Sequence, residues 1–248
     1  MNETKFFSAL LTALVVGAAA PAVAATVVAP GTSGDSTNKS LSVAARTVVK
    51  DVETVNGSIS VETGAQANSV ETVNGSIRVE ADVSVDSLET VNGSILAGAN
   101  LTVKGGVETV NGRIEIAQGS QIDGSVETVN GGISLHQVKV VQNVETVNGR
   151  LDLKASQIGG NVEMVNGRLD LTDASTIGGD VIVHKSKNWG WSWGSKSKPP
   201  VVVIGAGSEV RGQILIENEE TKLFVHENAR IGAVTGVTAQ RFSAEAPE

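Results

Sequence analysis

Seven glutamates recur in one short phrase, Val-Glu-Thr-Val-Asn-Gly or a close variant of it, at intervals of 18 or 19 residues. Carboxylates at a fixed interval form a column when the chain coils with a matching period. Such a column is expected either to be a solvated acidic stripe or to collect divalent cations or basic partners. The glycine-rich aspartate repeat of calcium-binding β-helices is absent, so no metal and no cofactor is expected. The glutamates are Glu53, Glu71, Glu89, Glu108, Glu127, Glu145 and Glu163.

A second chemically distinctive segment, from Lys185 to Pro200, holds all three tryptophans of the chain, four lysines and no acidic residue. Tryptophans two residues apart share one face of an extended segment. Indole rings favour membrane interfaces, and lysines favour anionic headgroups or polysaccharide. The insert is therefore expected either to fold back and cover part of the surface of the coiled repeats, or to project and bind an envelope component. Its candidate binding residues are Trp189, Trp191, Trp193, Lys185, Lys187, Lys196 and Lys198.

Groups that could support catalysis are few and scattered. The chain has no cysteine, and His136, His184 and His226 lie in no recognisable arrangement of nucleophile, base and orienting partner. We therefore expect no enzyme, with a polysaccharide-active enzyme as the remote alternative. The formal net charge of −8 argues against nucleic acid as a partner, because phosphate binding requires a basic surface.

The glutamate phrase is one part of a longer repeat, which predicts the architecture. A repeat of 18 or 19 residues cannot bury its own apolar face, so successive copies must stack and share a core. In the copy that begins at Val107, Ile114 and Ile116 alternate with polar residues, as in a strand with one buried face. The sequence predicts an all-β, single-stranded parallel β-helix of about ten three-sided rungs.

Each rung has an Asn-Gly pair between two short strands. Asn-Gly also favours two-residue hairpins, and a stack of hairpins would give an antiparallel meander. The segments between bends are too short for both arms of a hairpin, so the parallel coil is preferred. The asparagines are expected to form a hydrogen-bonded ladder, and the following glycines to allow a positive φ at the bend. The ladder comprises Asn56, Asn74, Asn92, Asn111, Asn130, Asn148 and Asn166.

The N-terminus has the features of a secretory signal peptide. Lys5 precedes an apolar run, and Ala22-Val23-Ala24 supplies small residues before an expected cut at Ala25. No later stretch approaches the roughly 20 apolar residues of a membrane span. We therefore expect an exported protein of a bacterial periplasm or cell surface, with no transmembrane span in the mature chain.

The expected organisation follows from these segments. Residues 1–24 are a signal peptide, residues 25–40 a flexible linker rich in small residues, and residues 41–237 the solenoid. Within the solenoid, repeats over residues 52–184 precede the insert at 185–200 and further rungs at 201–237. Ile204, Val210 and Ile216 follow one another at six-residue intervals there, which is the side length of a three-sided coil with this period. Residues 238–248 are expected to be a polar tail.

Two groups of bacterial proteins resemble this chain. The Val-Glu-Thr-Val-Asn-Gly-Ser-Ile repeats are similar to those of a β-strand-repeat adhesin family of exported proteins whose function is largely undefined. The stretch Val-Val-Val-Ile-Gly-Ala-Gly-Ser-Glu-Val-Arg-Gly-Gln-Ile, with Ala-Arg-Ile-Gly-Ala-Val-Thr-Gly after it, resembles the polymer-forming bactofilins. The second resemblance implies a right-handed β-helix and end-to-end filaments, although bactofilins are usually cytoplasmic.

The expected function is therefore a non-enzymatic cell-envelope solenoid that acts as an adhesin-like binding protein or as a structural scaffold. The expected partner is an anionic lipid, a polysaccharide or a protein of the envelope. A self-assembling, bactofilin-like filament is the alternative.

Overall fold

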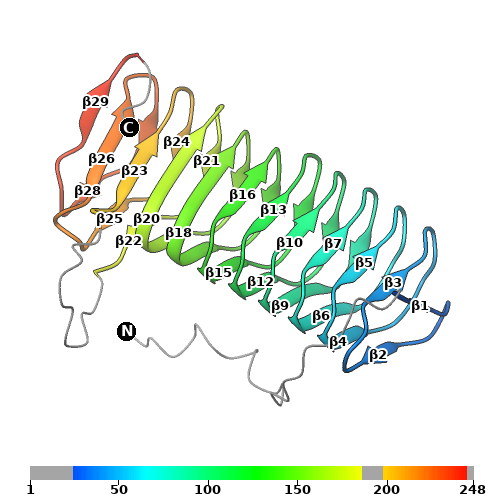
Figure 1. Ribbon diagram of the computed structural model, residues 1–248. Helices are drawn as coiled ribbons and strands as arrows, with labels where there is room; N and C mark the ends of the chain where they lie inside the picture. The colour runs from blue at the N-terminus through cyan, green and yellow to red at the C-terminus, as the bar shows by residue number, and fades with distance from the viewer. Residues whose placement is uncertain (1–24, 186–197, 245–248) are drawn as a thin grey trace, which may run out of the picture.

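The computed structural model describes residues 25–185 and 198–244. Within these ranges the chain contains strands and turns but no helix, and it coils about eleven times around one axis (Figure 1). The strands pair in parallel with strands one turn away, for example Val107 with Leu88 and Val126. The predicted parallel β-helix is confirmed, and the antiparallel meander is excluded. Among the described residues, no helix has the length and apolar character needed to cross a membrane.

The coil has three faces, two of which belong to one sheet. The first face carries the glutamate phrase. Its strands are β2 (Gly34–Ser36), β4 (Val52–Asn56), β6 (Ser69–Asn74), β9 (Ser87–Asn92), β12 (Val107–Asn111), β15 (Val126–Asn130), the first halves of β18 (Val144–Lys154) and β20 (Val162–Thr172), β22 (Val181–Val183), β25 (Ile214–Ile216) and β28 (Val234–Thr235).

The second face follows the Asn-Gly corner, which β18 and β20 cross without a break. Its other strands are β1 (Thr26–Val28), β3 (Leu41–Val43), β5 (Ile59–Val61), β7 (Ile77–Val79), β10 (Ile95–Ala97), β13 (Ile114–Ile116), β16 (Ile133–His136), β23 (Val201–Ile204), β26 (Lys222–His226) and β29 (Gln240–Phe242).

The third face is a separate sheet of short strands. These are β8 (Ser84–Val85), β11 (Thr102–Val103), β14 (Gln121–Ile122), β17 (Lys139–Val140), β19 (Gln157–Ile158), β21 (Thr176–Ile177), β24 (Glu209–Val210) and β27 (Arg230–Ile231). On each face, the strand of one turn pairs along its two edges with the strands of the preceding and following turns. This is the geometry that the repeat length predicts.

The core fills the inside of the coil with columns of aliphatic side chains. Val107, Ile114, Ile116 and Ile122 are all buried, and equivalent residues of neighbouring turns stack on them. One core column is polar, because the phrase threonine points inward on every turn from Thr54 to Thr146. Each of these hydroxyls donates to a corner carbonyl of the preceding turn, as Thr109 Oγ1 does to Gly93 O at 2.9 Å. The polar column is therefore hydrogen-bonded rather than a source of instability.

The corner glycines are required for a different reason from the one expected. Of the seven phrase glycines, Gly167 alone has a positive φ, at 124°. At all seven the chain passes so close to the preceding turn that a Cβ cannot fit. A Cβ on Gly131 would lie 1.7 Å from Gly112 O. The expectation of a positive φ at every Asn-Gly bend was wrong, and close stacking of corners explains the glycines.

Residues 25–40 form a turn of the coil, which corrects the expected linker. β1 pairs with β3 and β2 pairs with β4, and Val28 is buried opposite Val43. The small residues of this segment therefore lie in strands and turns of the coil rather than in a linker. This added turn raises the count from about ten to about eleven. The expected polar tail likewise begins within the coil, because β29 pairs with β26.

Candidate functional site: the first face and the root of the insert

The seven glutamates lie side by side on the outer surface of the first face. Glu53 is in register with Glu71, and the series continues through each phrase to Glu163. Neighbouring strands of a sheet are about 4.8 Å apart, so each carboxylate has a like charge at that spacing on either side. The first-face strands carry no lysine or arginine among the described residues, so no side chain of these two types offsets the column from the same face.

The pKa values of the glutamates reflect both their partial burial and the like charges on either side. Burial raises the pKa of Glu89 to about 7, with a further contribution from Glu71 and Glu108. Burial also raises the pKa of Glu127 to about 7, and Glu145 and Glu108 add to it. Partial burial against neighbouring side chains favours the neutral acid, and like charges act in the same direction. The face therefore loses negative charge in mildly acidic solution.

A column of valines runs beside the glutamates, two residues further along each strand. From Val55 to Val165 these side chains are only half-buried, because they point outward while the threonine between them points inward. The first face therefore combines a carboxylate column with an apolar stripe. On the next strand, β22, Ile182 lies opposite Glu163 and so follows the glutamate column. His184, two residues later, stands at the position of the valine column, which ends there.

The predicted asparagines form a continuous chain of amide hydrogen bonds along the corner. Each side-chain Nδ2 donates to the Oδ1 of the preceding turn at 2.9 or 3.0 Å. The chain extends one turn further than expected, because Asn56 donates to Asn38. It stops at Asn166, after which the insert replaces the corner. The role of the asparagines in this geometry is to hold successive turns in register.

Asn130→Ala is expected to destabilise the fold by about 1 kcal/mol, because an interior ladder position both donates and accepts one amide hydrogen bond. Asn166→Ala should cost roughly half as much, since no asparagine follows it and only the bond to Asn148 is lost. Urea unfolding of the two variants checks this ratio. Equal losses at both positions would contradict a stabilising contribution from each amide hydrogen bond of the ladder.

His184 joins three turns at the root of the insert. Its Nε2 lies 2.9 Å from Glu163 Oε2, and its Nδ1 lies 3.4 Å from Glu217 Oε2. The same Glu217 oxygen accepts the backbone N–H of Lys185 at 3.2 Å. The hydrogen bond to Glu163 raises the pKa of His184 and lowers the pKa of Glu163. Both shifts favour an imidazolium–carboxylate pair at the end of the glutamate column, where His184 can supply the positive charge that the rest of the column lacks.

His184→Gln is expected to reduce stability by about 1 kcal/mol near pH 6 and by much less near pH 9. The folded-state pKa of His184 is raised, so its contribution is complete below its ordinary value of 6.5 and is lost as pH rises through the folded value. Denaturant titrations of both chains at the two pH values check the difference. His136→Gln is the control, since His136 is exposed at the end of β16. A loss independent of pH would contradict a charged His184.

The insert occupies the Asn-Gly corner of a single turn. β22 ends just before it and lies between β20 and β25, while β23 begins just after it and lies between β20 and β26. The pairing of the coil is therefore unbroken on both sides. Lys185 and Lys198 are exposed at its two ends. The other predicted binding residues, Trp189, Trp191, Trp193, Lys187 and Lys196, lie outside the described residues.

The remaining histidines do not join this site. His226 packs edge-to-face on Phe242 at 5.1 Å, and its Nδ1 accepts the backbone N–H of Asn228. In residues 25–185 and 198–244, no cluster of three or more histidine, aspartate or glutamate side chains has the geometry of a metal site. The expectation missed the partnership of His184 with Glu163 and Glu217, because 21 and 33 residues separate them in the chain.

Comparisons of the chain with protein-family models, with curated proteins and with solved structures found no match.

Proposed function

We propose that this protein is a non-enzymatic, exported cell-envelope solenoid that binds an anionic component of the envelope through its tryptophan- and lysine-rich insert. The observation that carries the proposal is the position of the insert. It leaves and re-enters the coil at one corner, and the strands before and after it keep their partners on both neighbouring turns. A stiff coil that carries one chemically distinct segment is suited to present that segment to a partner.

The composition of the insert indicates the chemistry of the partner. Residues 185–200 hold four lysines, three tryptophans and no acidic residue in a chain of net charge −8. Lysines near a surface are attracted to anionic lipid by about 1 kcal/mol each, and tryptophan is enriched at the headgroup level. Export through the expected signal peptide would bring this segment to the envelope, in agreement with the resemblance to exported adhesins.

The two ends of the coil support an isolated rod rather than the filament that the bactofilin resemblance implies. At the last turn, Arg241 stands opposite the buried Val225. At the first turn, Gly34 and Ser36 stand opposite Val52 and Thr54. Edge strands of only two or three residues and a charged side chain such as Arg241 are features that protect sheet edges from pairing. We therefore propose that the mature protein works as single rods.

Deletion of residues 186–197, with a Gly-Ser link between Lys185 and Lys198, tests the proposal. Mature protein is mixed with vesicles that contain 30% anionic lipid and is then sedimented. The intact chain should bind and the deletion variant should not, while both keep the same unfolding midpoint. The control replaces Lys50 by Gln, which removes one exposed positive charge more than 130 residues before the insert. Equal binding of the intact and deletion chains would refute the role of the insert.

A further inference from the structure

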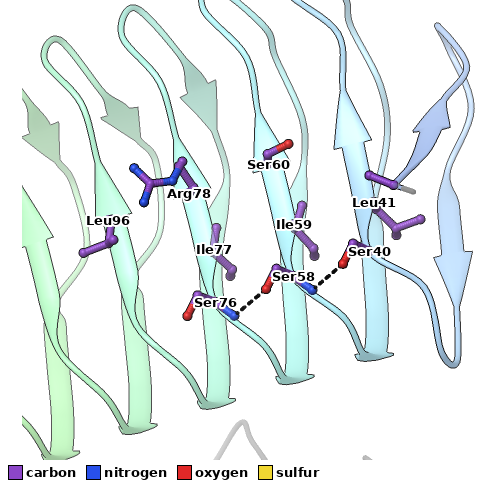
Figure 2. Close-up of a pocket in the computed structure, with 10 residues that line it drawn as sticks. Ser40, Leu41, Ser58, Ile59, Ser60, Ser76, Ile77, Arg78 and Leu96 are labelled. Carbon is purple, nitrogen blue, oxygen red and sulfur yellow. Dashed lines mark hydrogen bonds between the residues drawn. The ribbon is translucent and has the colours of Figure 1, made fainter. Parts of the chain in front are cut away.

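A shallow groove lies on the outer surface of the second face near the N-terminal end (Figure 2). Its volume is about 280 Å³, near the lower limit for small-molecule sites. It crosses strands β3, β5, β7 and β10, so its long axis follows the stack. The residues that determine its chemistry are Ser40, Ser58, Ser60, Ser76, Arg78 and Leu96.

Three of the serines, Ser40, Ser58 and Ser76, form a row of hydroxyl groups, one on each turn. Ser60 lies outside this row, and its hydroxyl donates to Ser42 Oγ at 3.3 Å. Ser40 Oγ accepts the backbone N–H of Ser58 at 3.1 Å, and Ser58 Oγ accepts the backbone N–H of Ser76 at 3.2 Å (Figure 2). These bonds fix the oxygens but leave the hydroxyl protons available, since a hydroxyl can donate one bond and accept two. The groove therefore presents hydroxyl donors at the spacing of the turns, about 4.8 Å.

Arg78 supplies a positive charge at the same surface. It lies on the exposed side of β7, between Ser60 and Leu96 in the register, and makes no ion pair or side-chain hydrogen bond with another described residue. Arg113, on the same face further along the coil, instead pairs with Glu115 at 3.1 Å. The Arg78 guanidinium thus keeps its full set of donors for an external carboxylate, which it can bind in bidentate geometry.

Ala25 lines the opposite end of the groove, beside Ser40 and Leu41. It is also the residue that would become the N-terminus after cleavage of the expected signal peptide. In a chain that begins there, the α-ammonium group stands at the rim of the groove. The mature groove would then hold one cation near each end and hydroxyl donors between them.

From this arrangement we propose that the groove binds a short acidic oligosaccharide along the axis of the stack. The serine hydroxyls donate to successive ring and hydroxyl oxygens, Arg78 holds a carboxylate, and Leu96 contacts the apolar face of a sugar ring. This site is separate from the insert and does not depend on the function proposed above. Only the contribution of the α-ammonium group depends on export and cleavage.

Calorimetric titration of the chain that begins at Ala25 with trigalacturonate tests the proposal. Binding should be measurable at low ionic strength, and maltotriose, a neutral trisaccharide, should bind at least about tenfold more weakly because it has no carboxylate. Arg78→Gln should weaken trigalacturonate binding about tenfold or more, whereas Arg113→Gln, the matched control, should change it less than twofold. Circular dichroism confirms that both variants remain folded.

Two further outcomes are expected. Deletion of residues 186–197 should leave trigalacturonate affinity unchanged, which separates this site from the insert. Acetylation of the Ala25 amine should weaken binding severalfold, because one of the two cations is lost. The proposal is overturned if trigalacturonate does not bind, if Arg78→Gln has no effect, or if inorganic phosphate binds as tightly as trigalacturonate, which would indicate a simple anion site.

Discussion

Gly131→Ala is expected to prevent stable folding of the coil, with a loss of about 4 kcal/mol or more. The added Cβ would lie 1.7 Å from Gly112 O, which belongs to the backbone of the preceding turn. That carbonyl cannot move freely, because it also accepts the Thr128 hydroxyl at 3.1 Å. Relief of the clash therefore requires separation of two turns along their common corner. Circular dichroism and urea unfolding of the purified variant measure the effect.

The matched control is Gly106→Ala, at a corner between the third and first faces. There an added Cβ would lie 3.2 Å from a Glu108 carboxylate oxygen, which is the mobile end of a side chain, and 3.3 Å from the backbone oxygen of Ser125, a contact that a shift of a few tenths of an ångström relieves. This variant should stay within about 1 kcal/mol of the parent. If Gly131→Ala were as stable as Gly106→Ala, the turns could not be stacked as closely at the Asn-Gly corner as described here.

The double substitution Glu89→Gln and Glu127→Gln is expected to stabilise the protein at pH 8. Both carboxyl groups have pKa values raised to about 7, so each is ionised at pH 8 in an environment that disfavours the charge. The amide removes the charge while it keeps the shape. Because both side chains are partly exposed, solvent screening reduces the gain to about 1 kcal/mol per site.

The gain should depend on pH in a defined direction. A carboxyl group with a raised folded-state pKa destabilises the fold increasingly as pH rises from about 4.5 to about 7, and by a constant amount above that. The double variant should therefore be clearly more stable than the parent at pH 8 and equal to it near pH 4.5. Glu62→Gln, at an exposed position, is the control. An advantage at pH 4.5 as large as at pH 8 would show that charge is not the cause.

The architecture was predictable from the sequence because the period of the repeat determines how the turns stack. The inward alternation of Ile114 and Ile116 and the alignment of asparagines also followed from the repeat. The threonine column was not foreseen, although Thr recurs in nearly every phrase. Burial of the polar Thr109 side chain requires a hydrogen-bond acceptor for its hydroxyl. That acceptor, Gly93 O, lies on another turn and is not evident from the sequence around Thr109.

The contacts of His184 and the groove near Arg78 could not be predicted from the sequence. The cluster of Glu163, His184 and Glu217 forms only because the insert is placed at a corner, so that residues on three turns meet. The groove near Arg78 results from small serines on adjacent turns, and a repeated Ser resembles ordinary surface composition. The linker was misassigned because residues 25–40 are rich in glycine, serine and threonine, and their pairing depends on partners in β3 and β4 that lie about one turn later in the chain.

Tryptophan fluorescence of the mature chain tests the central claim most directly, since Trp189, Trp191 and Trp193 are the only tryptophans and all belong to the insert. Emission and acrylamide quenching are recorded as vesicles containing 30% anionic lipid are added, with neutral vesicles as the control. The account predicts a shift to shorter wavelength and protection from quenching with the anionic vesicles only. Unchanged emission and quenching with the anionic vesicles would contradict the claim that the insert binds an anionic envelope surface.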